Sequence, residues 1–552
     1  MGQWVRFTSD ILYGIARSFS YGFSHVRFIA RRLKRPNARP DPARAPFTAQ
    51  TLTPPPPKTR PPQHNFYMLT GGSNFGFSAA DGVTTAYAPD TAIDWLLLRH
   101  EPKFSTFAAF HRAIAALAPA LLAAPLPPAP SPLGKNSEAA LFGDVAFLSN
   151  RGYLADSSEV VAFRGAQFFL PNHTVVILNG TAVVFNTSAA PDAPPPPPPQ
   201  QQQRPPRRPA AAPAWGIITE AIGAGTRTAA PAANARPLEM LNLTNNEVDY
   251  MYYSLQLDAP LNASELKVST CGGEYVYAFA REGGGGALVS LLPAQPARAP
   301  RDAHAFALPA EGPAAAATAL YVLVSAMGLS TSPRPGSCKG LTAVAAGKRD
   351  LTLAGWASAW VLPGEEKGYY TPAGAAAAPW APVDASGGAA PTSGFRATFD
   401  LPPPPPPAAG GGAAYPPGAP PQLAYAVDLL GATKGVLYVN GVNLGRYNLE
   451  LGKCSGSCAP PQHGDYCYIH WKNCGLPTQR WYHVPTSLLA ESGNLVVLFE
   501  ETATVPEAGQ GPVAPSPPPS RPAAGRAAAR LVGSTPRNLA TVQLVALGEH
   551  PQ

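Results

Sequence analysis

The alternation of apolar and polar positions predicts two helices near the start of the chain. In the first, Ser9–Phe19, the residues Ile11, Leu12 and Ile15 share one face with Phe19, and Ser9 suits the N-cap. A second helix is predicted over Lys103–Ala118. Its apolar stripe contains Phe104, Phe107, His111 and Ile114, and it is expected to end at Pro119.

Short β runs dominate the rest of the chain. Between Ala139 and Asn186 the runs "DVAFLSN", "EVVAFRG", "AQFFLP", "TVVILNG" and "TAVVFN" follow one another at near-regular spacing, which predicts a small β-sandwich module. A larger β-rich region begins near Pro237 and continues to Glu501. The late apolar run "LATVQLVAL" is long enough for one more, isolated strand.

Composition separates these ordered blocks from low-complexity segments. The chain has 552 residues, enough for about three or four domains, and its 68 Pro and 51 Gly gather in tracts rather than spreading evenly. Charged residues make up only 14% of the chain. Such Ala-, Pro- and Gly-rich tracts predict disordered insertions in a globular protein.

The formal charge of +7 is concentrated in one arm, which runs from Arg27 to Arg44 and contains seven basic residues against Asp41. A basic run of this kind can bind nucleic acid or an anionic membrane. No aromatic stacking platform or nucleic-acid motif accompanies it, so a solvated arm without a nucleic-acid partner is favoured. No run of about 18 apolar residues occurs, so no membrane span is predicted.

Cysteines and glycosylation sequons are typical of secreted domains. No signal peptide is visible after Met1, which suggests that the natural N-terminus precedes this sequence. Four cysteines are clustered, and five Asn-x-Ser/Thr sequons are glycosylation candidates. These residues are Cys454, Cys458, Cys467 and Cys474, and Asn172, Asn179, Asn186, Asn242 and Asn262.

The stretch "HNFYMLTGGSNFGF", His64–Phe77, reads as a short strand that breaks into a glycine-rich loop. With "TTAYAPDTAID" (Thr84–Asp94) it resembles the end of the catalytic barrel in glycoside hydrolase family 35, the β-galactosidases. "LLLRHEPKFSTFAAFHRAI" (Leu96–Ile114) resembles that family's next helix. Many positions agree at fixed spacing, so the resemblance is specific.

The C-terminal half resembles the plant branch of the same family. "KGVLYVNGVNLGRYN" (Lys434–Asn448) is similar to one of its strand-turn-strand motifs, and Cys454–Glu501 is similar to its cysteine-rich loop and final strands. "NNEVDYMYYS" (Asn245–Ser254) and "KRDLTLAGW" (Lys348–Trp356) match two further landmarks.

The resemblance implies a mainly β, multidomain chain: the remnant of a (β/α)8 TIM barrel followed by β-sandwich and jelly-roll, galactose-binding-like domains. The expected divisions are residues 1–24 and 64–120 for the barrel remnant, 25–63 for the disordered basic insert, 135–190 for a small β-sandwich, 191–235 for a linker, 236–370 and 394–501 for the jelly-roll region with spacers 371–393 and 402–421, and 502–552 for the tail.

Retaining glycoside hydrolysis needs two carboxyl groups roughly 5–5.5 Å apart. By resemblance, both would lie on barrel strands that precede this sequence, so both are expected to be missing. Asn246-Glu247 is an Asn-Glu pair, but its surroundings match a β-domain landmark rather than a barrel strand. Of the sugar-facing positions, Tyr67 is kept, while Pro89 replaces a second tyrosine. Tyr67 and Asn74 are the substrate-binding candidates, with ordinary loop packing as the alternative.

The spacing of the cysteine quartet, C-x3-C-x8-C-x6-C, leaves two interpretations open. Zinc sites usually use C-x2-C pairs, which are absent, so two disulfides are favoured over a metal site. The sequence is silent on Cys271 and Cys338. "QRWYHVP" (Gln479–Pro485) is either a carbohydrate platform or a strand that contributes to a core.

Three functions remain open on the sequence. The first is a β-galactosidase by descent that acts on terminal β-galactosyl residues of cell-wall or glycoprotein glycans and is inactive as written. The second is a secreted carbohydrate-binding protein that does not cleave its ligand, and the third is a proline-rich scaffold. None requires a cofactor, because the reaction uses two carboxyls and water. The family implies the secretory pathway, with the cell wall or vacuole as destination.

Overall fold

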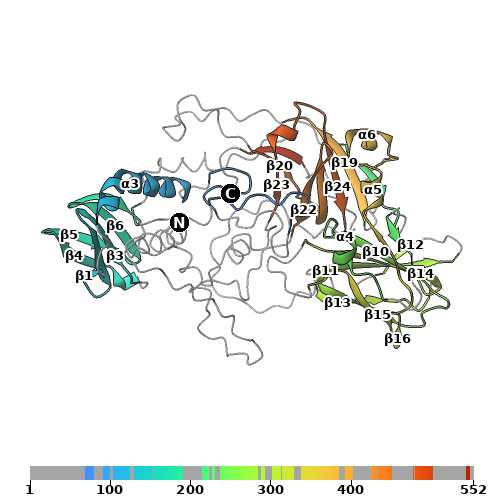
Figure 1. Cartoon of the computed structure of the whole chain (residues 1–552). Helices are drawn as coiled ribbons and strands as arrows, with labels where there is room; N and C mark the ends of the chain where they lie inside the picture. Colours follow the sequence, from blue (N-terminus) through green and yellow to red (C-terminus); the bar gives the residue numbers. More distant parts are fainter. Residues whose placement is uncertain are drawn as a thin grey trace, which may run out of the picture. The chain divides into compact units, whose positions relative to one another are not determined.

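The computed structural model describes residues 69–79, 91–99, 103–124, 130–152, 155–189, 214–222, 227–230, 236–283, 288–291, 301–311, 314–328, 337–383, 392–401, 424–430, 432–449, 477, 479–501 and 543–547. The chain forms two compact units. The first takes residues 1–70, 90–94 and 99–203, and the second takes 71–89, 95–98 and 204–552. Strands far outnumber helices, and every pairing between named strands is antiparallel, which confirms the predicted mainly β architecture (Figure 1).

The first unit contains an antiparallel sheet in the order β1-β2-β3-β6-β7 and a separate hairpin, β4–β5. On one face of the sheet, Phe110 of the helix α3 packs against Phe142 and Phe147 of the sheet. On the other face, the hairpin packs through its residues Val161 and Leu170. The elements are α3 (Lys103–Ala123), β1 (Ser131–Pro132), β2 (Ser137–Phe142), β3 (Val145–Asn150), η1 (Ala155–Ser157), β4 (Glu159–Phe163), β5 (Ala166–Leu170), β6 (Thr174–Asn179) and β7 (Ala182–Asn186).

Helix α3 differs from its prediction in two ways. It continues through Pro119 to Ala123, because Leu121 extends the buried face by another turn. His111, expected on the apolar stripe, is exposed, and Phe110 occupies the buried position instead. By length and composition α3 could cross a membrane, but its buried face packs on the sheet, as expected of a core helix.

A nine-stranded sheet forms the first half of the second unit, in the order β16-β15-β11-β14-β10-β17-β9, with β12 and β13 also paired to β11. The first part of β11 pairs with β13 and β15, and its last part pairs with β12 and β14. The elements are β9 (Thr228–Ala229), α4 (Met240–Thr244), β10 (Tyr250–Gln256), β11 (Glu265–Glu282), β12 (Leu288–Leu291), β13 (Arg301–Ala307), β14 (Ala317–Ser325), β15 (Leu341–Ala346), β16 (Arg349–Asp350) and β17 (Ala357–Trp360).

The second half of this unit has a six-stranded sheet, β18-β8-β19-β24-β21-β22, and a three-stranded sheet, β23-β20-β25. Phe395, Val427 and Leu437 are fully buried in the core that the two sheets share. The elements are β8 (Gly216–Thr219), α5 (Pro363–Glu366), α6 (Pro372–Ala377), β18 (Ala381–Pro382), β19 (Ser393–Phe399), β20 (Ala424–Asp428), β21 (Lys434–Val439), β22 (Val442–Asn448), β23 (Trp481–Val484), η2 (Thr486–Leu488), β24 (Asn494–Glu500) and β25 (Gln543–Leu547).

Segments expected to be linkers contribute to these sheets. Strands β8 and β9 lie within residues 191–235, and α6 and β18 lie within the expected spacer 371–393. Strand β25, expected to be isolated, pairs along its whole length with β20. Each of these strands is short or flanked by Ala, Gly and Pro, so local composition hides a pairing that depends on distant partners.

A further core joins the nine-stranded and six-stranded sheets. It contains Tyr250, Tyr252 and Leu323 from the first and Tyr438 and Phe499 from the second. All five side chains are less than 10% exposed. Because these apolar side chains are buried between the two sheets, they fix the relative position of the sheets within the unit.

Candidate functional site

The loop after the predicted strand Asn65–Thr70 rests on β22 of the six-stranded sheet. A Cβ atom placed on Gly445 would lie 2.5 Å from the backbone oxygen of Asn74 and 3.4 Å from that of Gly76. Gly445 also has a φ of +105°, which side chains rarely adopt. A glycine is therefore required at this position for two reasons, the backbone conformation and the close approach of the loop.

The same loop contacts β23. The Phe75 and His483 rings lie 6.2 Å apart at 50°. The Ser73 Oγ donates a hydrogen bond of 2.6 Å to the backbone oxygen of Trp95, and the Trp95 Nε1 donates one of 3.2 Å to that of Trp481. Two stretches singled out in the sequence, "HNFYMLTGGSNFGF" and "QRWYHVP", thus meet.

Strand β23 answers the question that "QRWYHVP" left open. Side chains alternate along it: Tyr482 and Val484 are buried in the core, and the His483 ring is turned toward Phe75 of the loop. The half-buried Trp481 packs beside Leu96 and Leu98. The prediction of a core strand is confirmed. Burial lowers the pKa of His483, opposed by a hydrogen bond with the Trp95 backbone.

Of the two predicted sugar-contacting residues, Asn74 is half-buried in this loop, and Tyr67 lies outside the described residues. The neighbouring Phe75 ring is 37% exposed. An amide and a partly exposed ring are groups with which proteins bind sugars, through hydrogen bonds and stacking on the ring face.

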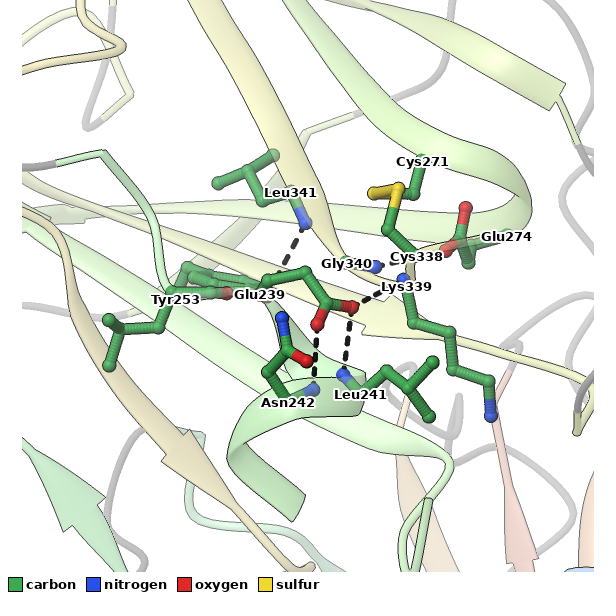
Figure 2. Close-up of a disulfide and its surroundings, with 11 residues drawn as sticks. Glu239, Leu241, Asn242, Tyr253, Cys271, Glu274, Cys338, Lys339, Gly340 and Leu341 are labelled. Atoms are coloured by element: carbon green, nitrogen blue, oxygen red, sulfur yellow. Dashed lines mark hydrogen bonds between the residues drawn. A yellow bond between two sulfur atoms is a disulfide. The ribbon is translucent and has the colours of Figure 1, made fainter. Parts of the chain in front are cut away.

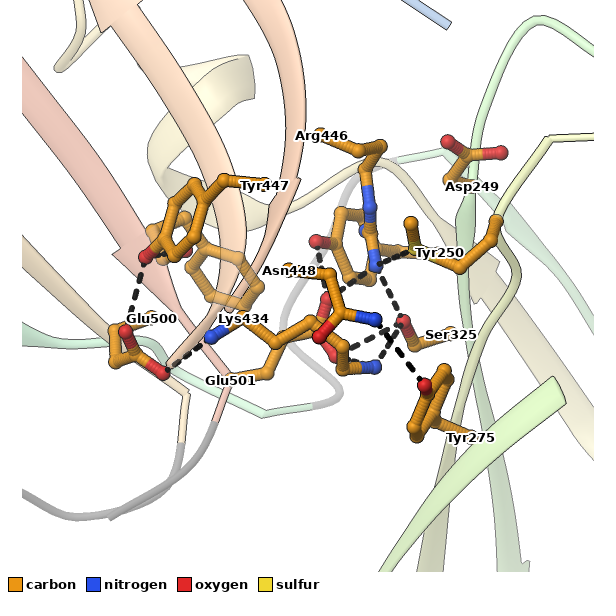
Figure 3. A network of polar contacts seen from close by, with 12 residues as sticks. Asp249, Tyr250, Tyr275, Ser325, Lys434, Arg446, Tyr447, Asn448, Glu500 and Glu501 are labelled. Atoms are coloured by element: carbon orange, nitrogen blue, oxygen red, sulfur yellow. Dashed lines mark hydrogen bonds and ion pairs between the residues drawn. The ribbon is translucent and has the colours of Figure 1, made fainter. Parts of the chain in front are cut away.

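A second polar cluster centres on Glu501, which follows β24 and is fully buried (Figure 3). Lys434 and Arg446 form ion pairs with its two carboxylate oxygens. Tyr250 and Tyr277 donate hydrogen bonds of 2.7 and 2.9 Å. The Ser325 Oγ donates a further hydrogen bond of 3.0 Å to Glu501. These donors come from β10, β11 and β14 of one sheet and β21 and β22 of the other, so the cluster joins the two sheets.

The electrostatics of this cluster indicate a structural ion network. Burial opposes ionisation of Glu501, yet Arg446 and Lys434 together lower its pKa to about 2. The Arg446 guanidinium also stacks over the Tyr250 ring, 4.5 Å from its centroid, and Lys434 lies 3.2 Å from that of Tyr275. With all its oxygens bound by donors, Glu501 has no capacity left to act on a ligand.

A third cluster contains two carboxylates that face one cavity. Glu220 follows β8, Glu365 belongs to α5, and the cavity between them has a volume of about 20 Å³. Such a volume admits about one water molecule. A glycosidase needs room for a sugar ring between its two carboxyl groups. This pair therefore does not form a hydrolytic site in the observed conformation.

Residues 395–494, which run from within β19 to the first residue of β24, match the family model for the galactose-binding domain of β-galactosidase. The chain is also 30% identical over 468 residues to "Beta-galactosidase 8" of Arabidopsis thaliana, an alignment that covers 79% of this chain and 50% of the relative. It is 28% identical over 472 residues to "Beta-galactosidase 11" of Oryza sativa subsp. japonica, with 80% and 48% covered. The chain is thus similar to β-galactosidases, as the sequence resemblance to glycoside hydrolase family 35 implied.

The chain spans about half the length of the curated relatives it matches. The motif "KGVLYVNGVNLGRYN", on which the resemblance depended, supplies Lys434 and Arg446 to the Glu501 network and Gly445 to the loop contact. Its Asn440 has a φ of +49° and Gly441 one of +88°, as the tight turn between β21 and β22 requires. Packing and turn geometry therefore account for several of the motif's residues.

A disulfide links Cys271 in β11 to Cys338, before β15, and settles a pairing on which the sequence was silent (Figure 2). Next to it, the Glu239 carboxylate caps α4 by accepting hydrogen bonds from the backbone nitrogens of Leu241 and Asn242, at 2.9 and 2.6 Å. The same carboxylate accepts one of 2.6 Å from Lys339 N. The disulfide thus fastens the helix cap to the long strand. The predicted quartet Cys454, Cys458, Cys467 and Cys474 lies outside the described residues.

The remaining candidates fall into two groups. Asn179, Asn242 and Asn262 are exposed, whereas Asn172 and Asn186 are half-buried. The Asn186 side chain also accepts a hydrogen bond of 2.9 Å from the Ser188 backbone. Asn246, set aside as a catalytic partner, accepts a hydrogen bond of 2.5 Å from Lys339 Nζ, while Glu247 is exposed.

Proposed function

We propose that this chain contributes to the recognition and retaining hydrolysis of terminal non-reducing β-D-galactosyl residues in cell-wall or glycoprotein glycans. The observation that carries the proposal is the position of the Asn74 loop. By family resemblance this loop faces the sugar, and it rests on β22 and β23 within the matched galactose-binding domain. The matched relatives are named β-galactosidases.

We further propose that these 552 residues do not hydrolyse β-galactosides by themselves. The family's nucleophile motif does not occur in the sequence, and its Asn-Glu pair occurs only as Asn246-Glu247, whose surroundings match a β-domain landmark. The carboxylates that share a cavity, Glu220 and Glu365, leave room for about one water molecule. On this proposal residues 1–24 and 64–120 are the end of a TIM barrel whose catalytic strands would be supplied by a longer protein.

Glycan binding without cleavage is the second candidate function. It is favoured by the match to a galactose-binding domain together with the partly exposed Phe75 ring beside Asn74. Aromatic and amide groups bind neutral sugars without any carboxylate. The two candidates share a ligand and differ only in turnover, so one set of measurements distinguishes them.

The experiment combines a chromogenic β-galactoside assay with retention on a galactan column, and a glucan column serves as the reference. The full chain is expected to be retained on galactan with no release of the chromophore. Release at a rate that a galactose-type inhibitor abolishes would refute the proposed lack of turnover. Equal elution from both columns would refute galactoside recognition.

Two pairs of variants locate the binding surface. Asn74→Ala is expected to weaken retention about tenfold, whereas Asn242→Ala, an exposed asparagine on α4, should leave it unchanged. Gly445→Ala is expected to displace the loop, because its new Cβ would lie 2.5 Å from the backbone oxygen of Asn74. Gly493→Ala is the matched control, since Gly493 also has a positive φ but no atom within 4 Å of a new Cβ.

The secretory route is the last part of the proposal, supported by the disulfide and the sequons. If the chain is made in a secretory host, glycans are expected at the exposed Asn179, Asn242 and Asn262. Lower occupancy is expected at Asn172 and Asn186, whose half-buried side chains are less accessible. Mass spectrometry of peptides before and after enzymatic glycan removal measures each occupancy, and glycan-free peptides at all five sequons would contradict this part.

A further inference from the structure

The cavity between Glu220 and Glu365 belongs to none of the sites that the proposed function uses. It lies where α5 and the segment leading to α6 pack on the six-stranded sheet. Both carboxylates and several aromatic rings line it. The aromatic residues are Tyr369, Tyr370, Trp380 and Tyr438.

Hydrogen bonds hold both carboxylates in place without any cation. The backbone nitrogen of Gly364 donates to the two oxygens of Glu220 at 2.9 and 3.2 Å. Tyr438 Oη donates to one oxygen of Glu365, and the backbone nitrogen of Leu362 lies 3.4 Å from the other. In the part of the chain that the structure describes, neither glutamate has a Lys or Arg within ion-pair distance.

We propose that Glu220 and Glu365 form a proton-dependent clasp that fastens residues 362–380 to the six-stranded sheet in acid and loosens them as the pH rises through neutrality. Two ionised carboxylates that face one small cavity repel each other and need hydration. About one water fits between them, so full hydration would require the segment to move away from the sheet. A proton on one carboxyl group removes the repulsion.

The pKa values of the two groups agree with this geometry. Burial raises the pKa of Glu220 to about 7; the charge of Glu365 acts in the same direction, and the Gly364 amide and Lys367 oppose it. Burial also raises the pKa of Glu365, against the Tyr438 hydrogen bond. The other charged or titratable groups around the pair are Tyr252, Asp249, Tyr369, Tyr370, Arg396 and Arg446.

The sign of the effect follows from the raised pKa. A carboxyl group whose pKa is higher in the folded state stabilises the fold below its ordinary pKa of 4.5, and that stabilisation is lost as the pH rises through about 7. Lys434 titrates in the same range, because burial lowers its pKa to about 7, and it acts in the opposite direction. A comparison of variants is therefore needed rather than a single curve.

The test measures denaturant unfolding of the full chain between pH 4.5 and 8 for the wild type, Glu220→Gln and Glu265→Gln. The equilibrium constant for unfolding of the wild type, divided by that of Glu220→Gln, is expected to rise about tenfold to a hundredfold between pH 4.5 and 8. The range allows for solvent access to the pair, which weakens the effect of the charge. Glu265→Gln should follow the wild type, because Glu265 is a surface residue paired with Lys267 at 3.3 Å. Parallel curves for the wild type and Glu220→Gln would overturn the proposal.

A second measurement covers the case in which Glu220→Gln does not fold. Hydrogen exchange at the Gly364 amide, which donates to Glu220, is followed in the wild-type chain and corrected for the intrinsic pH dependence of exchange. Protection is expected to fall around pH 7 at Gly364 and to stay constant at the Tyr252 amide in β10. Constant protection at both amides would overturn the clasp.

Discussion

The Glu501 cluster and the Glu220–Glu365 cavity show how one side-chain type serves two roles within a single unit. At the first site Glu501 is fully buried and accepts a hydrogen bond from Tyr250, and at the second Glu365 is half-buried and accepts one from Tyr438. At Glu501 two cations accompany the carboxylate, and its pKa falls to about 2. Among the described residues no Lys or Arg forms an ion pair with Glu220, and its pKa rises to about 7. The supply of countercharge, rather than burial alone, decides whether a buried glutamate is ionised.

The largest expected effect comes from removing the charge of Glu501. Glu501→Gln leaves the Arg446 guanidinium buried without its counterion, and breaking a buried ion network in this way costs about 3–5 kcal/mol. Urea unfolding at pH 7 measures the loss. Glu220→Gln at the same pH is the matched comparison and should cost far less; equal losses for the two variants would erase the distinction between the clusters.

The pH dependence separates the clusters by sign. Stability contributed by Glu501 is present above its ordinary pKa of 4.5 and is lost as the pH falls toward about 2. Replacing Glu501 should therefore flatten the acid limb of the stability curve, whereas replacing Glu220 should change the limb around neutrality. Thermal melting of both variants from pH 2.5 to 8 tests this. If Glu220→Gln altered the acid limb, or if Glu501→Gln left the acid limb unchanged, the pKa assignments would be wrong.

Removing one tyrosine hydroxyl from each cluster is expected to give a smaller difference in stability between them. Tyr250→Phe removes a hydrogen bond of 2.7 Å to an ionised carboxylate, worth about 1.5–3 kcal/mol. Tyr438→Phe, measured at pH 5, removes a hydrogen bond to Glu365, whose raised pKa favours the neutral form, and such a bond is worth about 0.5–1.5 kcal/mol. Chemical denaturation of the two single variants compares them directly. The reverse order would place the ionised carboxylate at Glu365.

The smallest expected loss of stability comes from removing the helix cap beside the disulfide. Glu239→Ala leaves the Leu241, Asn242 and Lys339 amides without their shared acceptor, and the loss of an N-cap side chain costs about 0.5–2 kcal/mol. Glu247→Ala, an exposed position after the same helix, is the control and should be neutral. Denaturation midpoints give both values. A loss as large as that for Glu501→Gln would mean that α4 anchors the whole sheet.

Local patterns predicted much of the β architecture. The β runs between Ala139 and Asn186, the strand at Trp481–Val484 and the turn at Asn440-Gly441 follow from alternation and turn chemistry. The motif around Lys434 and Arg446 was recognised, but its use was not. Their partner Glu501 and the tyrosines that bind it lie far away in the sequence, and no local pattern encodes such a pairing.

The Glu220–Glu365 cavity was missed for a second reason. Glu220 lies in a segment expected to be a linker, and Trp380 lies in one expected to be a spacer, because Ala, Gly and Pro dominate both. Local composition predicts flexibility, but it does not predict short edge strands that are stabilised by pairing with residues distant in the sequence. The Cys271–Cys338 pair was undetermined for the same reason, since its 5.4 Å Cα separation depends on the packing of β11 beside β15.

Strand β25 has a practical consequence for anyone who trims this protein. A fragment ending at Glu501 would keep every family motif yet lose Gln543–Leu547, which pairs with the whole of β20. The unpaired backbone groups along β20, including those of the buried residue Val427, would then be open to other molecules. Exposed strand edges of this kind pair with strands of other chains. Solubility of such a fragment should depend on whether those five residues are grafted back.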